Sequence, residues 1–130
     1  MNYLTTSINE SSVIVGTAAS AIADVRGHAV KFNASGDVVL CGAGEIPLGI
    51  GIMTMGDQGA IAQGEEFTIQ HKAIGLVAAG GEIAKGANLS TDANGAFVTA
   101  TTGGSPTPVV AIALEAAAAS GQYIKAILRF

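Results

Sequence analysis

The sequence is short of the residues on which many common protein classes depend. Its 130 residues include no tryptophan, two tyrosines, four phenylalanines and a single cysteine. With Cys41 alone, neither an intrachain disulfide nor a thiolate metal cage can form. No run of about 18 apolar residues is present, so no membrane-spanning helix is expected. The first residues also lack the basic and apolar segments of a secretory signal, so we expect synthesis in the cytoplasm.

Charge is scarce as well. Charged residues make up 12% of the chain and apolar residues 49%, and this charged share is about half that of an average globular domain. A surface so poor in charge favours association with other chains over a free monomeric state. The net charge is −4 and the six basic residues are scattered. Direct binding to nucleic acid is therefore not expected, because no basic stripe is available to neutralise phosphates.

Alternating apolar residues and frequent turn residues predict an all-β fold. The runs "HAVKF" and "VVLC" flank the turn sequence "NASGD", which predicts a β-hairpin. Asn94-Gly95 suits a second tight turn, because this pair tolerates a positive φ. Strands at roughly ten-residue spacing with glycine-rich turns are typical of a β-sandwich or β-barrel. Further strands are expected at 13–15, 46–53, 66–77, 109–115 and 122–130.

Three segments are less clear. Thr17 to Arg26 fits either a short helix, capped by Thr17 and ended by Gly27, or extended chain, and we favour extended chain. The alanine run after Glu115 is too short to nucleate a helix alone, so we expect a strand and then a turn at Ser120-Gly121. Residues 1–12 are polar and predict an N-terminal arm that orders on a partner, followed by one β-rich domain at 13–130.

One motif raises the possibility of a carrier domain. The segment "GEIAKGANL" has the spacing G-x-I-x-x-G-x-x-L, which also occurs in biotinyl and lipoyl domains. Such domains present a lysine beside methionine or aspartate at a hairpin tip. Here Lys85 lies inside the glycine run, and Lys72 follows His71 in a predicted strand. A carrier domain therefore stays the least favoured alternative.

No other pattern predicts chemistry. In "CGAGE" a dinucleotide loop would need a third glycine where Pro47 stands, and no phosphate-binding P-loop motif occurs. His28 and His71 are expected in strands, partly buried and with backbone partners, since no convergent groups accompany them. Cys41 ends an apolar run and is expected in the core. Adjacent Glu65 and Glu66 would face opposite sides of a strand. We therefore expect no enzyme and no catalytic, cofactor-binding or metal-binding residue.

Four stretches, in order, resemble the small capsid decoration (cement) proteins of tailed bacteriophages. They are "GHAVKF", "GEEFTIQHKAIGLVAAGGEIAKGANLSTDANGAFV", "PTPVVAIALEAAAASGQ" and "YIKAILRF". Their order and spacing carry the resemblance, which extends from Gly27 to Phe130. One departure is that family members often have an aromatic residue where Ser90 and Thr91 stand.

The resemblance implies a small β-barrel or sandwich-like domain of the β-tulip type behind an extended arm. It also implies homotrimers that bind the major capsid protein at three-fold positions outside the virion shell and stabilise the head. Within the arm, Tyr3, Leu4 and Ile8 are the candidates for contact with the capsid, the alternative being that they are disordered. Another virion role, in a head fibre, the tail or head completion, remains the second hypothesis.

Overall fold

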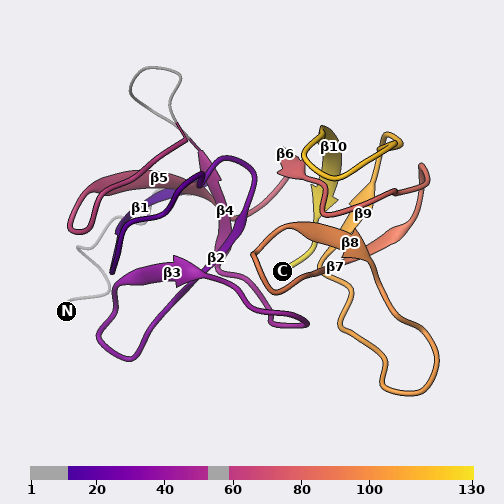
Figure 1. Ribbon diagram of the computed structural model, residues 1–130, viewed down its shortest axis with the longest axis horizontal. Helices are drawn as coiled ribbons and strands as arrows, with labels where there is room; N and C mark the ends of the chain where they lie inside the picture. The colour runs from indigo at the N-terminus through magenta and orange to yellow at the C-terminus, as the bar shows by residue number, and fades with distance from the viewer. Residues whose placement is uncertain (1–11, 53–58) are drawn as a thin grey trace, which may run out of the picture.

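The computed structural model describes residues 12–52 and 59–130 and shows only β-strands in them, joined by turns and loops (Figure 1). The predicted all-β class is therefore confirmed. Most of the predicted arm, with Tyr3, Leu4 and Ile8, lies outside the described residues. The ten strands are β1 (Val13–Thr17), β2 (Ala29–Phe32), β3 (Val38–Leu40), β4 (Gly49–Ile52), β5 (Glu66–Gln70), β6 (Ile74–Ala78), β7 (Asn88–Thr91), β8 (Phe97–Thr99), β9 (Ala111–Ala113) and β10 (Tyr123–Leu128).

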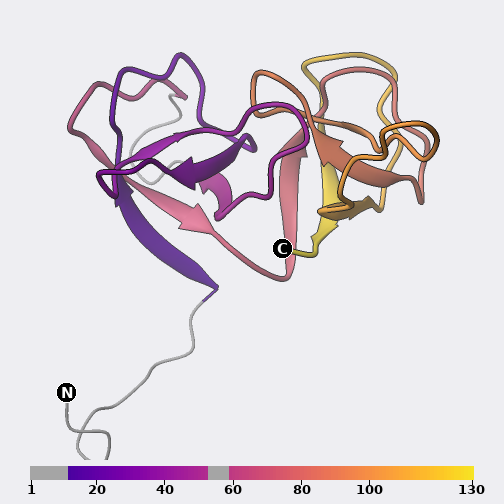
Figure 2. The same ribbon diagram turned by 90° about the horizontal axis from the view of Figure 1, so that it is seen from below.

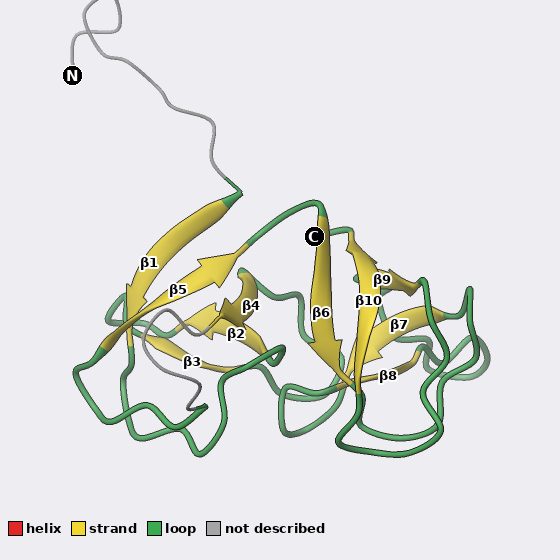
Figure 3. Ribbon diagram, turned by 90° about the horizontal axis from the view of Figure 1, so that it is seen from above, coloured by secondary structure: helices red, strands yellow, loops and turns green. Residues whose placement is uncertain are grey.

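The strands form two antiparallel sheets that lie side by side along the long axis (Figures 1 and 3). The strand order of the first sheet is β1-β5-β4-β2-β3, and that of the second is β6-β10-β9-β7-β8. Both sheets are open, with β1 and β3 at the edges of one and β6 and β8 at the edges of the other. The architecture is thus sandwich-like, and the closed barrel that the sequence left possible is not formed.

The two sheets are structural repeats of each other. Counted from its first strand, each sheet has the order 1-5-4-2-3. We call residues 13–70 repeat 1 and residues 74–128 repeat 2. The hydrogen bonds outside the strands also correspond. For example, Gly27 N donates to Gly51 O at 3.0 Å in repeat 1, and Gly86 N donates to Ala113 O at 2.7 Å in repeat 2.

The correspondence is closest in the two predicted hairpins, β2-β3 and β7-β8, where a side chain holds the turn. The Asn33 Oδ1 atom accepts hydrogen bonds from the backbone N–H groups of Ser35 and Asp37, at 2.9 and 3.0 Å. Fifty-nine positions later, Asp92 Oδ1 accepts the same two bonds from Asn94 and Ala96, at 2.8 and 3.0 Å. Each turn closes on a glycine of positive φ, which only glycine adopts without strain.

Each repeat has its own core, but the two cores are built differently. All the buried apolar residues of the first core come from repeat 1. The second core takes most of its residues from repeat 2 and three, Ala29, Cys41 and Ile50, from repeat 1. Cys41 is 1% exposed, which confirms its expected place in a core. Burial raises the pKa of its thiol to about 11, so it is protonated at neutral pH.

Several expectations about strand boundaries were wrong. The strand expected at 46–53 begins only at Gly49, and the one expected at 109–115 spans Ala111–Ala113. The alternating run 66–77 is not one strand, because residues 71–73 turn the chain from β5 into β6, with Ala73 at φ 72°. His71 and Lys72 therefore lie in this connection. His28 precedes β2 and also lies outside a strand, although it is partly buried and its Nδ1 lies 2.9 Å from Arg26 O, the kind of backbone partner expected. Thr17 to Arg26 contains no helix, as favoured.

The paired turns give a test of the side-chain role. Asp92→Ala removes the acceptor of two backbone N–H groups and is expected to lower the free energy of unfolding by about 1–2 kcal/mol. Asp92→Asn keeps an equivalent oxygen, as Asn33 does in repeat 1, and should stay within about 0.5 kcal/mol of the wild type. Urea unfolding measures both values, and equal losses for the two variants would refute this role of Asp92.

Candidate interaction surface

The repeats meet at a seam where their backbones touch directly. Ala78 N on edge strand β6 donates to Gly27 O at 2.9 Å, and Ala29 N donates to Gly95 O at 2.7 Å. Both glycines have positive φ. A Cβ on Gly27 would lie 2.8 Å from Ala78 N, and a Cβ on Gly95 would lie 2.8 Å from Ala29 O. Glycine is therefore required at both positions for conformation and for space.

A third contact of the seam involves the loop before β4. Thr91 Oγ1 donates to Gly42 O at 2.8 Å, and Gly44 N donates back to Thr91 O at 3.0 Å. Ser90 and Thr91, where family members often have an aromatic residue, are both buried. Thr91 thus fills the place with a polar contact between the repeats, while Ser90 Oγ has no hydrogen-bond partner among the described residues.

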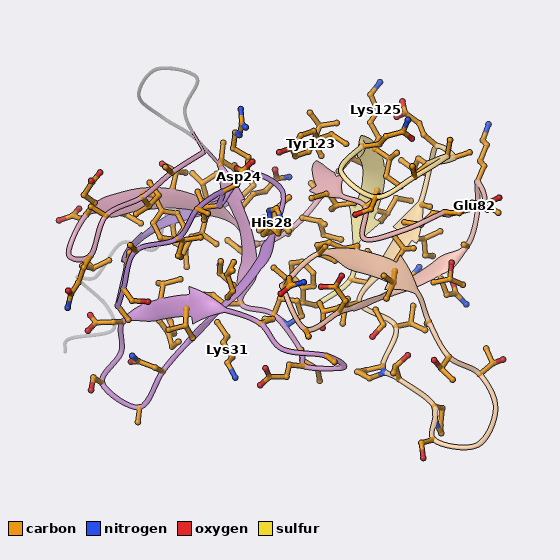
Figure 4. All side chains as sticks on the ribbon, viewed as in Figure 1. Asp24, His28, Lys31, Glu82, Tyr123 and Lys125 are labelled. Carbon is orange, nitrogen blue, oxygen red and sulfur yellow. The ribbon has the colours of Figure 1, made fainter. Side chains whose placement is uncertain are left out.

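A charged cluster covers the outer side of the seam (Figure 4). Arg26 Nε and Nη2 each donate to the Asp24 carboxylate at 3.0 Å, and Tyr123 Oη donates to Asp24 Oδ2 at 3.1 Å. The Arg26 guanidinium also lies over the Tyr123 ring, 5.9 Å from its centroid. Because Tyr123 belongs to repeat 2, this cluster fastens the two repeats together through side chains.

The cluster shifts two pKa values. The hydrogen bond from the Arg26 side chain lowers the pKa of Asp24 below its ordinary 3.8, and the Arg26 N–H and the Tyr123 hydroxyl add to the effect. Burial opposes this lowering. The pKa of Tyr123 is raised, first by burial and then by the neighbouring Asp24 charge. The carboxylate and the phenol are therefore held in the protonation states that their hydrogen bond requires.

Beside the cluster lies an apolar cleft of about 550 Å³, which we call the seam cleft. It lies between β4 of repeat 1 and the strands β6 and β10 of repeat 2. Its lining residues are Arg26, Gly27, Ile50, Gly51, Ile52, Gln70, Ile74, Gly75, Leu76, Tyr123 and Lys125. The walls are mostly aliphatic and backbone, so the cleft suits an apolar side chain of a partner better than a polar small molecule.

Exposed apolar side chains gather on the first strand of each repeat. On β1, Val13 and Val15 are 39% and 62% exposed. At the corresponding positions of β6, Ile74 and Leu76 are 57% and 56% exposed. Both are edge strands, and an exposed edge with apolar side chains is a ready site for association. This agrees with the association expected from the low charge.

One face of the molecule combines the start of β1, the β5–β6 connection and the chain end, and we call it the arm face (Figures 2 and 3). The carbonyl oxygen of Ser12, the last residue of the predicted arm, accepts a hydrogen bond from His71 N at 2.9 Å. Leu128 N donates to Ala73 O at 2.9 Å, which brings the chain end with Arg129 against the β5–β6 connection that contains Lys72. Two exposed basic side chains thus lie beside the point where the arm leaves the domain.

Comparison with known proteins settles the family. The family model for phage cement proteins matches residues 27–129. The chain belongs to the phage cement protein family. No curated protein sequence matches it. The fold resembles the head fiber gp8.5 N base of bacteriophage phi29, with a TM-score of 0.61 and 20% sequence identity over 89% of this chain and 92% of that one.

Membership of this family makes the chain a structural component of the virion that associates with the capsid. Among residues 12–52 and 59–130, no group of three or more His, Cys, Asp or Glu side chains is placed to hold a metal ion. No helix long and apolar enough to cross a membrane is found in the same residues. The other residues that sequence analysis considered for chemistry lie away from the Asp24 cluster. Lys85 is in the turn before β7, and Glu65 and Glu66 are both exposed. The features that sequence analysis missed in this cement protein are Asp24, Arg26 and Tyr123.

The acid stability of this cement protein should depend on Asp24. Its pKa is lower in the folded than in the unfolded chain, so its contribution is present above the unfolded value and is lost as pH falls through the folded one. The Asp24 and Arg26 side chains are 34% and 36% exposed, so we expect less than about 1 kcal/mol. Urea unfolding of wild type and Asp24→Asn between about pH 2 and 6 should give curves that converge below pH 4. Parallel curves would contradict it.

Proposed function

We propose that the protein binds the outer surface of the major capsid shell, as homotrimers at three-fold positions, and stabilises the head. The observation that carries this proposal is the cement family match over residues 27–129. A small domain with few charges and exposed apolar edges is suited to such a role. Many copies on one shell multiply a modest contact by avidity, which resists the pressure of the packaged DNA.

The arm face is the surface that turns toward the capsid in this proposal. Ser12, the last residue of the predicted arm, lies on this face, and Tyr3, Leu4 and Ile8 are the apolar anchors available in the arm sequence. Ordering a dozen residues costs on the order of 10 kcal/mol. A preformed groove or a free strand edge on the shell offsets such a cost. Lys72 and Arg129 on the same face supply positive charge for an acidic shell surface.

A second candidate function is the base of a head fibre. It is favoured by the fold shared with the head fiber gp8.5 N base over 89% of this chain. A fibre base also binds the head, but it serves to present another element. The two functions therefore differ in what the particle loses when the protein is absent. Loss of a cement protein lowers the rupture temperature of the head, whereas loss of a fibre base leaves it unchanged.

Deleting residues 1–12 tests the role of the arm. The truncated chain keeps all ten strands and should fold with most of its stability, but should bind capsids more weakly. Capsids that carry it should rupture at a lower temperature than capsids that carry the full chain. Co-sedimentation and thermal rupture of particles that lack the native protein provide the measurements. Equal occupancy and equal rupture temperature would remove the arm from the mechanism.

Charge reversal tests the arm face itself. Lys72→Glu with Arg129→Glu should reduce capsid occupancy at least tenfold at low salt, and the loss should shrink as salt screens the charges. Lys125→Glu, on the side of the seam cleft, is the control and should bind like the wild type. Lys125→Glu makes half of the charge change of the double variant, so a clear loss of binding in this control would show that binding follows net charge and not this face.

A further inference from the structure

The two seam glycines of positive φ, Gly27 and Gly95, each have a counterpart in the other repeat that faces open space. In the superposition of repeats set by their hydrogen bonds, Gly27 corresponds to Gly86 and Gly95 to Gly36. All four have positive φ. A Cβ on Gly86 or Gly36 would meet no atom within 4 Å, whereas Gly27 and Gly95 are closed off by the facing repeat. Each end of the molecule therefore carries a copy of one side of the seam, and no facing repeat covers that copy.

The same holds for the residues around these glycines. Ala29 is fully buried in the seam, and its counterpart Asn88 is exposed. Thr91 is buried there, and its counterpart Phe32 is 50% exposed. We call Val15, Thr17, Phe32, Gly36 and Glu66 the free face of repeat 1. We call Lys85, Gly86, Asn88, Ile112 and the loop 101–109 the free face of repeat 2.

We infer that the free face of repeat 1 docks on the free face of repeat 2 in a second copy of the chain, and so repeats the internal seam between molecules. Thr17 N of one copy takes the place of Ala78 N and donates to Gly86 O of the next copy. Asn88 N donates in turn to Gly36 O, as Ala29 N does to Gly95 O inside the chain. The proposed function assumes self-association, and this inference assigns the surfaces that make it.

The apolar parts of the two free faces match. Ile74 and Leu76 of repeat 2 line the seam cleft, and Val13 and Val15 occupy the corresponding positions of repeat 1. The facing wall in the chain is Ile50 and Ile52, and the sheet registers place Ile112 and Leu114 at the corresponding positions of repeat 2. Docking therefore forms a second aliphatic cleft between copies. It also brings Phe32 onto the 101–109 loop, where Val109 is 43% exposed.

The charges match as well. Arg26, which covers Tyr123 in the seam, corresponds to Lys85, and Tyr123 corresponds to Glu66. The cation–π contact inside the chain thus becomes an ion pair of opposite charges between copies. Both side chains are exposed, and neither forms an ion pair within the described part of a single chain. This pair gives the docking a polarity that a purely apolar contact lacks.

The contact is heterologous, since two different faces meet. It therefore joins copies head to tail, and it closes into a ring when the rotation between successive repeats is a whole fraction of a turn. The free faces lie at opposite ends of the long axis, with β1 at one end and the loops of the second sheet at the other (Figure 1). In the trimer of the proposed function, such a ring would hold six similar units, because each chain contributes two repeats.

Charge reversal in both directions tests the docking without any capsid. We expect Glu66→Lys and Lys85→Glu each to weaken self-association about tenfold in sedimentation velocity, since like charges then face each other. The double variant Glu66→Lys/Lys85→Glu restores the pair and should associate like the wild type. Glu82→Lys is the control, because it makes the same charge change as Glu66→Lys but lies outside both free faces. Its counterpart in repeat 1, Ala21, stays exposed beside the internal seam, so docking is not expected to cover this position. Circular dichroism checks that all four variants are folded.

A zero-length carbodiimide cross-link gives an independent measurement. In a mixture of ¹⁴N- and ¹⁵N-labelled wild-type protein, we expect a Lys85–Glu66 link that joins light and heavy chains. A wild type that stays monomeric at tens of micromolar would overturn the inference. So would singly reversed variants that associate normally, or a double variant that is not restored. Capsid binding is measured separately, so association without capsid binding would count against the proposed function alone.

Discussion

The whole molecule depends on the close approach of two backbones at the seam. Gly27 and Gly95 make this approach possible, because a Cβ at either position would occupy the space of a facing backbone atom. The hydrogen bonds that result lie between residues of different repeats and fix one repeat against the other. Around them, the Asp24 carboxylate holds Arg26 and Tyr123 together across the same boundary. Two small open sheets are thereby joined into one folded unit.

Because the chain consists of two similar repeats, each side of the seam is present twice. One copy is covered by the other repeat, and the second copy is not. An edge strand such as β6 is covered on one side by the other repeat, whereas its counterpart β1 has no such cover among the described residues. Proteins usually protect such edges with charge, proline or a covering loop. Here the β1 edge carries Val13 and Val15, which is the opposite of protection and consistent with a protein that works in an assembly.

The parts of the fold that sequence predicted are those fixed by local chemistry. Asn33 and Asp92 hold their turns through bonds to residues two and four positions away, so the hairpins could be recognised from short segments. The turn at Ala73 was missed, because alanine has no preference for a positive φ and the alternation of apolar residues continues through it.

The repeat and the seam were beyond sequence reasoning for a different reason. The segments 27–41 and 86–100 occupy equivalent places, yet they share only Gly27/Gly86, Ala34/Ala93, Gly36/Gly95 and Val39/Val98. The two repeats share their backbone conformation, and many different side chains are compatible with that conformation. Asp24 and Tyr123 are 99 positions apart, and nothing in either local sequence indicates that they meet. The family resemblance, by contrast, was carried by motif order and was confirmed.

The unequal cores have a consequence for the order in which the chain acquires structure. Repeat 1 builds its core from its own residues, whereas the core of repeat 2 is completed by Ala29, Cys41 and Ile50. Synthesis proceeds from the N-terminus, so these three side chains are available before the first strand of repeat 2 has left the ribosome. The first half of the chain then acts as a template for the second. When the nascent chain forms the core of repeat 2, the residues of repeat 1 that complete this core are already present.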